Sequence, residues 1–334
     1  MSNRDFKMRA LTDIWTGDAE GQGERLIATG LLGSIRWWFE VLVRGLGGKA
    51  CDPTLPEVRC PAPSKTPYEP GHHCVVCELF GCTGWARKFR LEVLDENHRP
   101  KSDQIKAGDI FILRFTELRL IREEEWCLLG LTLRLIAGYG AIGGKTVFKP
   151  SDEQNRQNAF HHKDFGLISI VEAPSTIHCV GKEALEAYVR DGKWRAYFND
   201  RDFSWASLAN FWCVKGRYLA RQDANESTFN KVIGRPEPKN QSTEGDSWLA
   251  GRRARRQPPQ DPESKKVFSF KEPSNAQRTF GFVNPDIQIS GALLDFNEIR
   301  GRLEEAWPDF KDSEFIRGQT ILQSLLSSAS GGAP

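Results

Sequence analysis

The sequence predicts an α+β protein with two domains. Its 334 residues are more than one small domain uses, since domains commonly have about 100–200 residues. Hydrophobic residues make up 39% and charged residues 27% of the chain, which argues against wholesale disorder. In the first half, segments with helical spacing lie between segments of period two, so helices and strands are mixed along the chain.

The elements of the first half follow from these two periods. One helix is predicted over 31–46, where apolar residues recur every three or four positions. A second is predicted over 123–137; it is apolar nearly all round, so we expect it to be buried, and the acidic residues 123–125 suit its N-terminus. Strands are predicted at 7–14, 86–94, 109–120 and 167–171. The resulting order of elements is that of the split βαβ, or ferredoxin-like, module, which RNA-recognition domains also use.

The second half carries weaker signals. Residues 181–220 are predicted to be helical and aromatic, and short strands are predicted at 267–270 and 279–283. One or two amphipathic helices are predicted at the C-terminus. Residues 220–264 are polar and rich in proline, and they include the arginine cluster at 252–256, so we expect a long mobile loop there.

The charge balance limits the classes of function. Lysine and arginine number 46 against 44 aspartate and glutamate residues, so any nucleic-acid role must depend on local basic patches. The apolar runs are too short to span a bilayer, and the polar start of the chain does not resemble a signal peptide. We therefore expect a soluble, cytoplasmic protein without a membrane partner.

Five of the eight cysteines fall within 32 residues, which favours a metal site over disulfides in a cytoplasmic chain. A C-x-x-C pair places two thiolates within reach of one ion, and Zn²⁺ takes four such ligands in a tetrahedron. We predict a structural zinc ion held by Cys51, Cys60, Cys74 and Cys77. The alternatives are free thiols in a core or a redox pair, and Cys82, His72 and His73 compete for places among the ligands. The remaining cysteines, Cys127, Cys179 and Cys213, are predicted to be single buried residues.

The glycine-rich stretch 138–146 does not fit a nucleotide-binding motif. The spacing to Gly144-Lys145-Thr146 is wrong for a Walker A loop, and the match to the dinucleotide fingerprint follows a helix where a strand is required. What remains is a flexible turn whose backbone N–H groups, with Lys145 beside them, can lie against a phosphate backbone. The alternative is a plain turn joining a helix to a strand.

Two sets of cations are candidates for RNA contact. On the first helix, Arg36 stands beside Trp37, and an aromatic ring next to a guanidinium suits base stacking and phosphate contact. The alternative is a solvated ion-pair series of Arg36, Glu40 and Arg44. Arg87 and Lys88 form either a backbone-contact strip or a solvated face. No catalytic motif is present, and the pair His161-His162 lies in a polar stretch typical of exposed histidines.

Several motifs together resemble a known family. They are Trp15-Thr16-Gly17, Gly33-Ser34-Ile35-Arg36-Trp37-Trp38, Gly45-Leu46-Gly47-Gly48 with Ala50-Cys51-Asp52-Pro53, Cys77-Glu78-Leu79-Phe80-Gly81-Cys82-Thr83-Gly84-Trp85, and Gly140-Ala141-Ile142-Gly143-Gly144-Lys145-Thr146. In this order they resemble the first subunit of the type III-B CRISPR Cmr effector complex, a family of the RAMP (repeat-associated mysterious protein) superfamily. The resemblance covers about the first 150 residues.

The resemblance implies two ferredoxin-like domains, which we place at 1–175, with a cysteine-rich insertion, and at 176–334. It implies a non-catalytic, RNA-binding subunit at the end of a ribonucleoprotein filament, near the 3′ part of the guide RNA, which helps to capture target RNA in antiviral defence. Carried over by motif, the RNA-facing residues are Arg36, Trp37, Gly143, Gly144 and Lys145. The family's simplest members lack the cysteines, although cysteine clusters elsewhere in the superfamily are associated with zinc.

Two competing functions remain open at this stage. The first is an endoribonuclease of the same superfamily that processes guide precursors, which needs a general base such as His161 or His162. The second is a phosphate-binding enzyme that uses the glycine-rich stretch, which the failed spacings disfavour.

Overall fold

A computed structural model describes residues 3–17, 23–53, 55, 57–144, 150–156, 159–196, 203–223, 226–235, 247–251, 263–289 and 291–330. The chain divides into two compact units. Unit 1 comprises residues 1–145, 166–209 and 318–334, and unit 2 comprises residues 146–165 and 210–317. The sequence placed a single boundary after residue 175, whereas in this division both units are made of separate stretches of chain.

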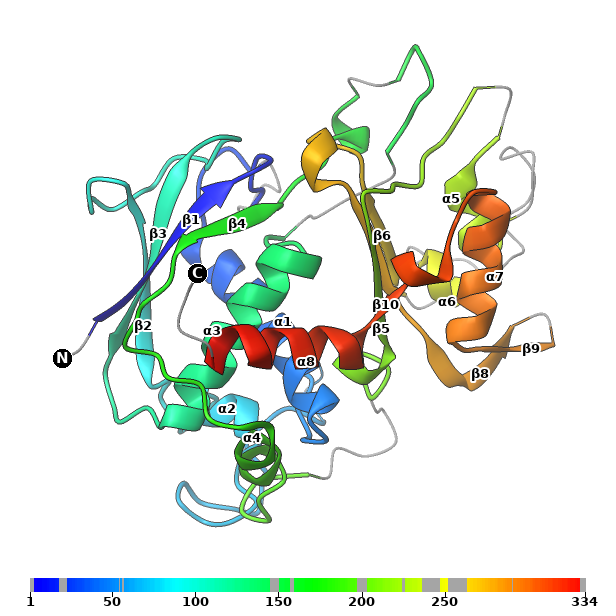
Figure 1. Cartoon of the computed structure of the whole chain (residues 1–334). Helices are drawn as coiled ribbons and strands as arrows, with labels where there is room; N and C mark the ends of the chain where they lie inside the picture. The colour runs from blue at the N-terminus through cyan, green and yellow to red at the C-terminus, as the bar shows by residue number, and fades with distance from the viewer. Residues whose placement is uncertain are drawn as a thin grey trace, which may run out of the picture. The chain divides into compact units, whose positions relative to one another are not determined.

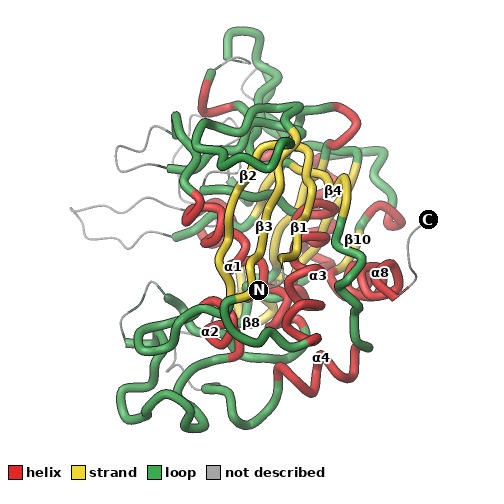
Figure 2. The backbone as a smooth tube through the Cα atoms, turned by 90° about the vertical axis from the view of Figure 1, so that its left-hand side faces the viewer, coloured by secondary structure: helices red, strands yellow, loops and turns green. Residues whose placement is uncertain are grey.

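Unit 1 is built on a four-stranded sheet with the strand order β2-β3-β1-β4, in which every neighbouring pair is antiparallel. Figure 2 shows these strands side by side in that order. Its elements are β1 (Asn3–Ala10), α1 (Ala28–Gly45), α2 (Val75–Phe80), β2 (Phe89–Asp95), β3 (Ile110–Glu117), α3 (Glu123–Tyr139), β4 (Ile168–Glu172), α4 (Lys182–Val189) and α8 (Gly318–Ser330). Helices α1 and α3 make the two crossover connections and lie on the same side of the sheet (Figure 1). The predicted order of strand, helix, strand, strand, helix, strand is confirmed for this unit.

The core of unit 1 lies between the sheet and these helices. Alternate residues of β1, among them Phe6 and Met8, are buried, as the period of a strand with one covered face requires. Phe115 of β3 meets Phe6 and Phe89 with ring centroids 5.9 and 5.2 Å apart, so three strands contribute to one aromatic cluster. Helix α3 is buried around most of its surface, as predicted.

Unit 2 repeats the strand order of unit 1. Its sheet has the order β10-β5-β7-β6, again wholly antiparallel. Numbered among the four strands of this sheet alone, the order is fourth, first, third, second, as in unit 1. Its elements are β5 (Phe211–Lys215), α5 (Thr228–Val232), α6 (Ser247–Ala250), β6 (Val267–Phe270), β7 (Arg278–Phe282), β8 (Asn284–Ile289), β9 (Ala292–Leu294), α7 (Phe296–Ala306) and β10 (Ile316–Arg317). Strands β8 and β9 form a separate hairpin. The core packs helices α5 and α7 against the sheet around Trp212 and Phe229.

Several predictions for the second half need correction. Among the described residues of 181–220, only α4 is an α-helix. Phe211–Lys215 instead forms a central strand in which four successive residues are buried, a pattern that periodicity does not distinguish from a buried helix. The strands predicted at 267–270 and 279–283 and the C-terminal helices are present. The segment 220–264 contains the short helices α5 and α6 in its described parts, and the arginine cluster at 252–256 lies outside the described residues. No helix in the described ranges is long and apolar enough to cross a membrane.

Candidate metal centre and its surroundings

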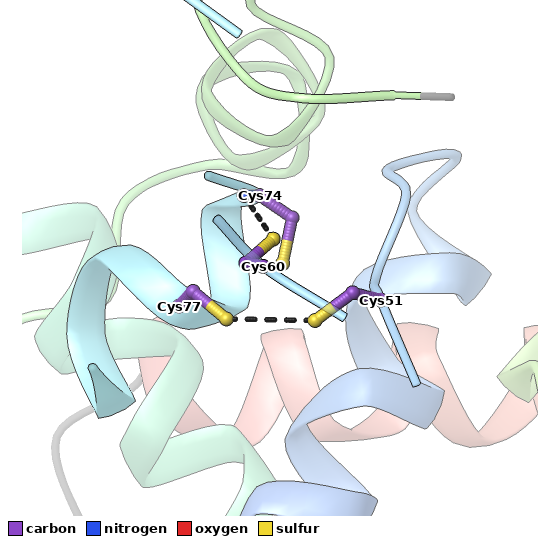
Figure 3. A group of neighbouring side chains, drawn as sticks. All are labelled: Cys51, Cys60, Cys74 and Cys77. Atoms are coloured by element: carbon purple, nitrogen blue, oxygen red, sulfur yellow. Dashed lines mark hydrogen bonds between the residues drawn. The ribbon is translucent and has the colours of Figure 1, made fainter. Parts of the chain in front are cut away.

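The four cysteines predicted as ligands come together in unit 1. Cys51 follows α1, Cys60 lies in the loop beyond it, Cys74 is the N-cap of α2, and Cys77 lies in the first turns of that helix. All four are buried, and their Sγ atoms lie within 4.8 Å of one another (Figure 3). The Sγ atoms of Cys51 and Cys77 are 3.5 Å apart. The other candidates, Cys82, His72 and His73, do not belong to this group.

The arrangement has the size and chemistry of a metal site. Zinc–sulfur bonds of about 2.3 Å in a tetrahedron place sulfur atoms about 3.8 Å apart, so the observed group needs little movement to close on an ion. The backbone N–H of Cys74 donates to the Sγ of Cys60 over 3.2 Å, a contact that suits a thiolate acceptor. The residues present therefore fit a tetrahedral ion with four sulfur ligands.

Arg36 of α1 lies against this cluster. Its Nη2 donates to the Sγ atoms of Cys77, over 3.2 Å, and Cys51, over 3.6 Å, and its Nη1 donates to the carbonyl of Gly81 over 3.3 Å. Its Nε donates to Glu40 over 3.0 Å, and only 15% of the side chain is exposed. The guanidinium that the sequence assigned to RNA is thus engaged at all three nitrogens within the protein.

The series Arg36, Glu40 and Arg44, which the sequence offered as the alternative, is present as ion pairs. Glu40 lies 3.0 Å from Nε of Arg36 and 3.6 Å from Nη2 of Arg44. It is buried where the sequence expected a solvated face, because the cysteine-rich segment (residues 51–82) covers this side of α1. Burial raises the pKa of Glu40 to about 7, against the opposing effect of the two arginines.

A second polar network lies beside the cysteine cluster, around Glu78 of α2. Glu78 accepts from His73 Nε2 over 2.7 Å, and its other oxygen lies 2.5 Å from Nζ of Lys88. Lys88 also donates to both oxygens of Glu125, over 2.8 and 2.9 Å, and Glu125 accepts from the hydroxyl of Tyr188 over 2.8 Å. These contacts tie α2, the start of β2, α3 and α4 together.

The network explains two pKa shifts. Burial opposes ionisation of Glu78, but the hydrogen bonds and charges of His73 and Lys88 outweigh it and lower the pKa of Glu78 to about 2. Burial and the carboxylate of Glu125 raise the pKa of the Tyr188 hydroxyl. Lys88, which the sequence placed in an RNA-contact strip, is buried among these partners, since only 7% of its side chain is exposed.

The glycine-rich turn packs against α1 and the loop after β1. The N–H of Gly143 donates to the hydroxyl of Ser34 over 3.1 Å, and the N–H of Gly144 donates to the carbonyl of Trp15 over 2.9 Å. Gly143 has φ of +116°, and a Cβ there would lie 2.7 Å from the carbonyl oxygen of Trp15, so the position requires glycine. Lys145 lies outside the described residues.

The remaining candidate residues, from the predicted RNA contacts and the histidine pair, differ in how exposed they are. Trp37 is half-buried, with its ring in edge contact with Trp38 at 4.9 Å between centroids. Arg87 is exposed, next to the buried Lys88. His162 is buried, and the structure does not describe the side chain of His161.

Near Arg87 lies an aromatic group that the sequence reasoning missed. The guanidinium of Arg119 lies over the ring of Trp85 at 4.4 Å, and the ring of Tyr68, which is 86% exposed, meets Trp85 at 5.1 Å. Trp85 was noted only as part of a motif, and Arg119 and Tyr68 come from segments far from it in the chain. No local pattern links the three.

The prediction of three single buried cysteines needs one correction. Cys127 of α3 and Cys179 form a disulfide with 4.7 Å between their Cα atoms, whereas Cys213 is a buried free cysteine, as predicted. The pairing joins residues 52 positions apart, so it depends on the fold and leaves no trace in local spacing.

Comparisons with known proteins find solved structures and one sequence pattern to which this chain is similar. No curated protein matches the sequence. The chain is similar to the solved structure of Cmr1 from Pyrococcus furiosus in its apo form, with 12% identity over 95% of this chain and 99% of that chain and a TM-score of 0.43. It is also similar to a chain of the type III-B Cmr-beta complex bound to cognate target RNA, with 11% identity over 91% of this chain and 98% of that chain and a TM-score of 0.45.

The sequence pattern of the RAMP superfamily matches residues 7–148. This range contains every motif on which the predicted resemblance depended and all four cysteines of the cluster. Over residues 7–148, the chain is thus similar in sequence to the RAMP superfamily.

Proposed function

We propose that the protein is a non-catalytic, RNA-binding subunit of a type III-B CRISPR ribonucleoprotein complex, with guide RNA, target RNA and other Cmr subunits as its partners. The observation that carries the proposal is the match of residues 7–148 to the RAMP superfamily, together with the ordered motifs that resemble the first Cmr subunit. We place the subunit at the end of the filament, near the 3′ part of the guide, where it helps to capture target RNA in antiviral defence in the cytoplasm.

We propose further that each unit is a ferredoxin-like domain. Both sheets have the strand order fourth, first, third, second, with all neighbours antiparallel, and in both a helix lies between the third and fourth strands. This supports the assignment because the split βαβ module has that order of elements and is a common platform for RNA.

The RNA-facing residues in this proposal are Trp37, Arg87, Gly143, Gly144 and Lys145. Arg87 is an exposed cation, and Gly144 is exposed at the glycine-rich turn, where the lack of a side chain lets an RNA backbone approach closely. Arg36 and Lys88 are omitted, because each is already engaged by buried partners that a phosphate would have to displace.

The test is a binding and cleavage experiment with the purified full-length chain and single-stranded RNA of repeat sequence, with and without EDTA. We expect weak binding that falls as salt rises, and intact RNA in both conditions. Cleavage that disappears when His161 or His162 is replaced would favour the endoribonuclease instead. Failure to enter a complex with the other Cmr subunits and a guide RNA would refute the assembly part of the proposal.

We also propose that the cysteine cluster binds one structural zinc ion. Four buried sulfur atoms within 4.8 Å of one another support this, since soft thiolate ligands in a tetrahedral set select zinc. The cysteine-rich segment contains little regular structure apart from the six-residue helix α2, so a metal would supply much of what holds it. Elemental measurement should give about one zinc per chain, and metal-free protein of unchanged thermal stability would refute the proposal.

A further inference from the structure

We propose that Arg36 is a positioning residue of the metal centre, which holds two of the four thiolates by hydrogen bonds and thereby determines how firmly the ion is retained. The inference rests on the proposed zinc site and adds a role for a residue outside the ligand set. It begins from one atom: Nη2 of Arg36 donates to the Sγ atoms of both Cys51 and Cys77.

The first argument is charge. A zinc ion with four thiolates has a net charge of −2, and such a charge is costly to bury unless cations or N–H donors compensate for it. All four cysteines are buried, and the Arg36 guanidinium brings a full positive charge into contact with two of them. Arg36 would therefore offset half of the excess charge of the loaded centre.

The second argument is geometry. Cys51 and Cys77 are 26 residues apart and come from different segments, yet one nitrogen contacts both, and their sulfur atoms lie 3.5 Å apart, close to the edge of a zinc–sulfur tetrahedron. A guanidinium can do this while its other two nitrogens bind Glu40 and the carbonyl of Gly81, because its five N–H groups form a rigid planar fork. A lysine ammonium has its three N–H donors on one nitrogen and would not reach all of these partners.

The third argument is that Arg36 is itself held in place. Glu40 fixes Nε from one turn further along α1, and the carbonyl of Gly81, at the end of α2, fixes Nη1. The Arg36 side chain thus links α1, which carries it, to α2, which carries Cys77. Partners that orient metal ligands in this way commonly contribute a factor of about 10–100 to metal affinity.

The experiment compares full-length wild-type protein, Arg36→Gln and Arg44→Gln in competition for zinc with a chromogenic chelator. Arg44 is the matched control, because it lies on the same helix and pairs with the same Glu40, while its guanidinium donates to the carbonyls of Ala206 and Ala50. We expect Arg36→Gln to weaken zinc binding about 10–100-fold and Arg44→Gln to change it less than about threefold. Arg36→Lys, which keeps the charge, should fall between wild type and Arg36→Gln.

Cobalt substitution gives a readout that a purely structural role would not move. Loss of N–H···S hydrogen bonds leaves the thiolates more electron-rich, so the sulfur-to-cobalt charge-transfer bands of Arg36→Gln should shift relative to wild type and those of Arg44→Gln should not. Equal zinc affinity and equal cobalt spectra in Arg36→Gln and wild type would overturn the role of Arg36 while leaving the zinc proposal intact. Equal losses in both variants would also overturn it, since a buried cation beside Glu40 would then be the cause. A wild-type protein that holds no zinc would refute the metal site itself.

Discussion

Replacing Lys88 by methionine distinguishes a structural lysine from an RNA-contacting one. Nζ of Lys88 lies 2.8 Å from Glu125, whose side chain is 1% exposed, and 2.5 Å from Glu78. Methionine fills similar space but leaves the buried Glu125 carboxylate without its cation. Removing one partner of a buried ion pair typically costs about 3–5 kcal/mol, a large share of the roughly 5–15 kcal/mol by which domains are stable.

The expected loss is large enough to measure by thermal and urea unfolding. At about 2–4 °C per kcal/mol for a domain of this size class, Lys88→Met should lower the melting temperature by about 6–20 °C. A second change, Glu125→Gln in the same chain, should recover part of the loss, because a neutral amide needs no cation. RNA affinity, measured well below the melting temperature, should keep its dependence on salt.

The matched control is the neighbouring Arg87→Met, which removes an exposed cation from the adjacent position. It should change stability by less than about 0.5 kcal/mol. The reasoning would be refuted if Lys88→Met melts within about 1 °C of wild type and instead flattens the salt dependence of RNA binding. The ion pairs of Lys88 would then contribute little to the free energy of unfolding, and Lys88 would be an RNA contact.

The other predictions concern metal, RNA, the glycine-rich turn and pH. Serine in place of any one cysteine of the cluster should abolish stoichiometric zinc by elemental measurement, whereas Cys82→Ser should retain it. Arg87→Ala should weaken binding to unrelated RNAs equally and lower the log–log salt slope by about 0.7, the value for one lost phosphate contact, and an unchanged slope would exclude that contact. Gly143→Ala should lower the melting temperature because a Cβ there would lie 2.7 Å from a carbonyl oxygen, whereas Gly138→Ala, which has open space, should be neutral or slightly stabilising. Burial raises the pKa of Asp164 to about 6, although two backbone N–H groups oppose the shift, so its contribution to stability is full below about pH 4 and is lost as pH rises through 6. Asp164→Asn should therefore gain up to about 3 kcal/mol relative to wild type between pH 4 and 7 in urea unfolding, and identical pH profiles would contradict this.

How much of the fold could be predicted depends on how local its signals are. Strand β1 was predictable because it has one covered face, so that Phe6 and Met8 alternate with partly exposed residues. Strand β5 was not, because four successive residues are buried and no period remains. The division into units was also beyond local reasoning, since α8, at the end of the chain, belongs with the first unit.

The candidate site also contains residues that local spacing predicts and residues that only the tertiary structure brings together. The four cysteines could be predicted as a set, because the chemistry of zinc and the C-x-x-C spacing both restrict the choice. The environment of Lys88 could not, since Glu78 precedes it by 10 residues and Glu125 follows it by 37, and both lie in other elements, α2 and α3. The disulfide between Cys127 and Cys179 likewise depends on a tertiary contact.

Helix α1 shows why a correct element can still lead to a wrong environment. Its apolar stripe predicted the face that meets the core, and that face is buried as expected, with Ile35 and Trp38 among the core residues. The same pattern implied that the polar face meets water, which makes Arg36 available to RNA. That step assumes that nothing else covers the helix, but the cysteine-rich segment does cover it. Glu40 is only 5% exposed, and residues 38–43 are all buried. A metal-binding insertion can cover a polar face because its sulfur atoms accept hydrogen bonds from a guanidinium. In a chain with clustered cysteines, a charged residue on an amphipathic helix is therefore as good a candidate for a partner of the metal ligands as for a contact with RNA.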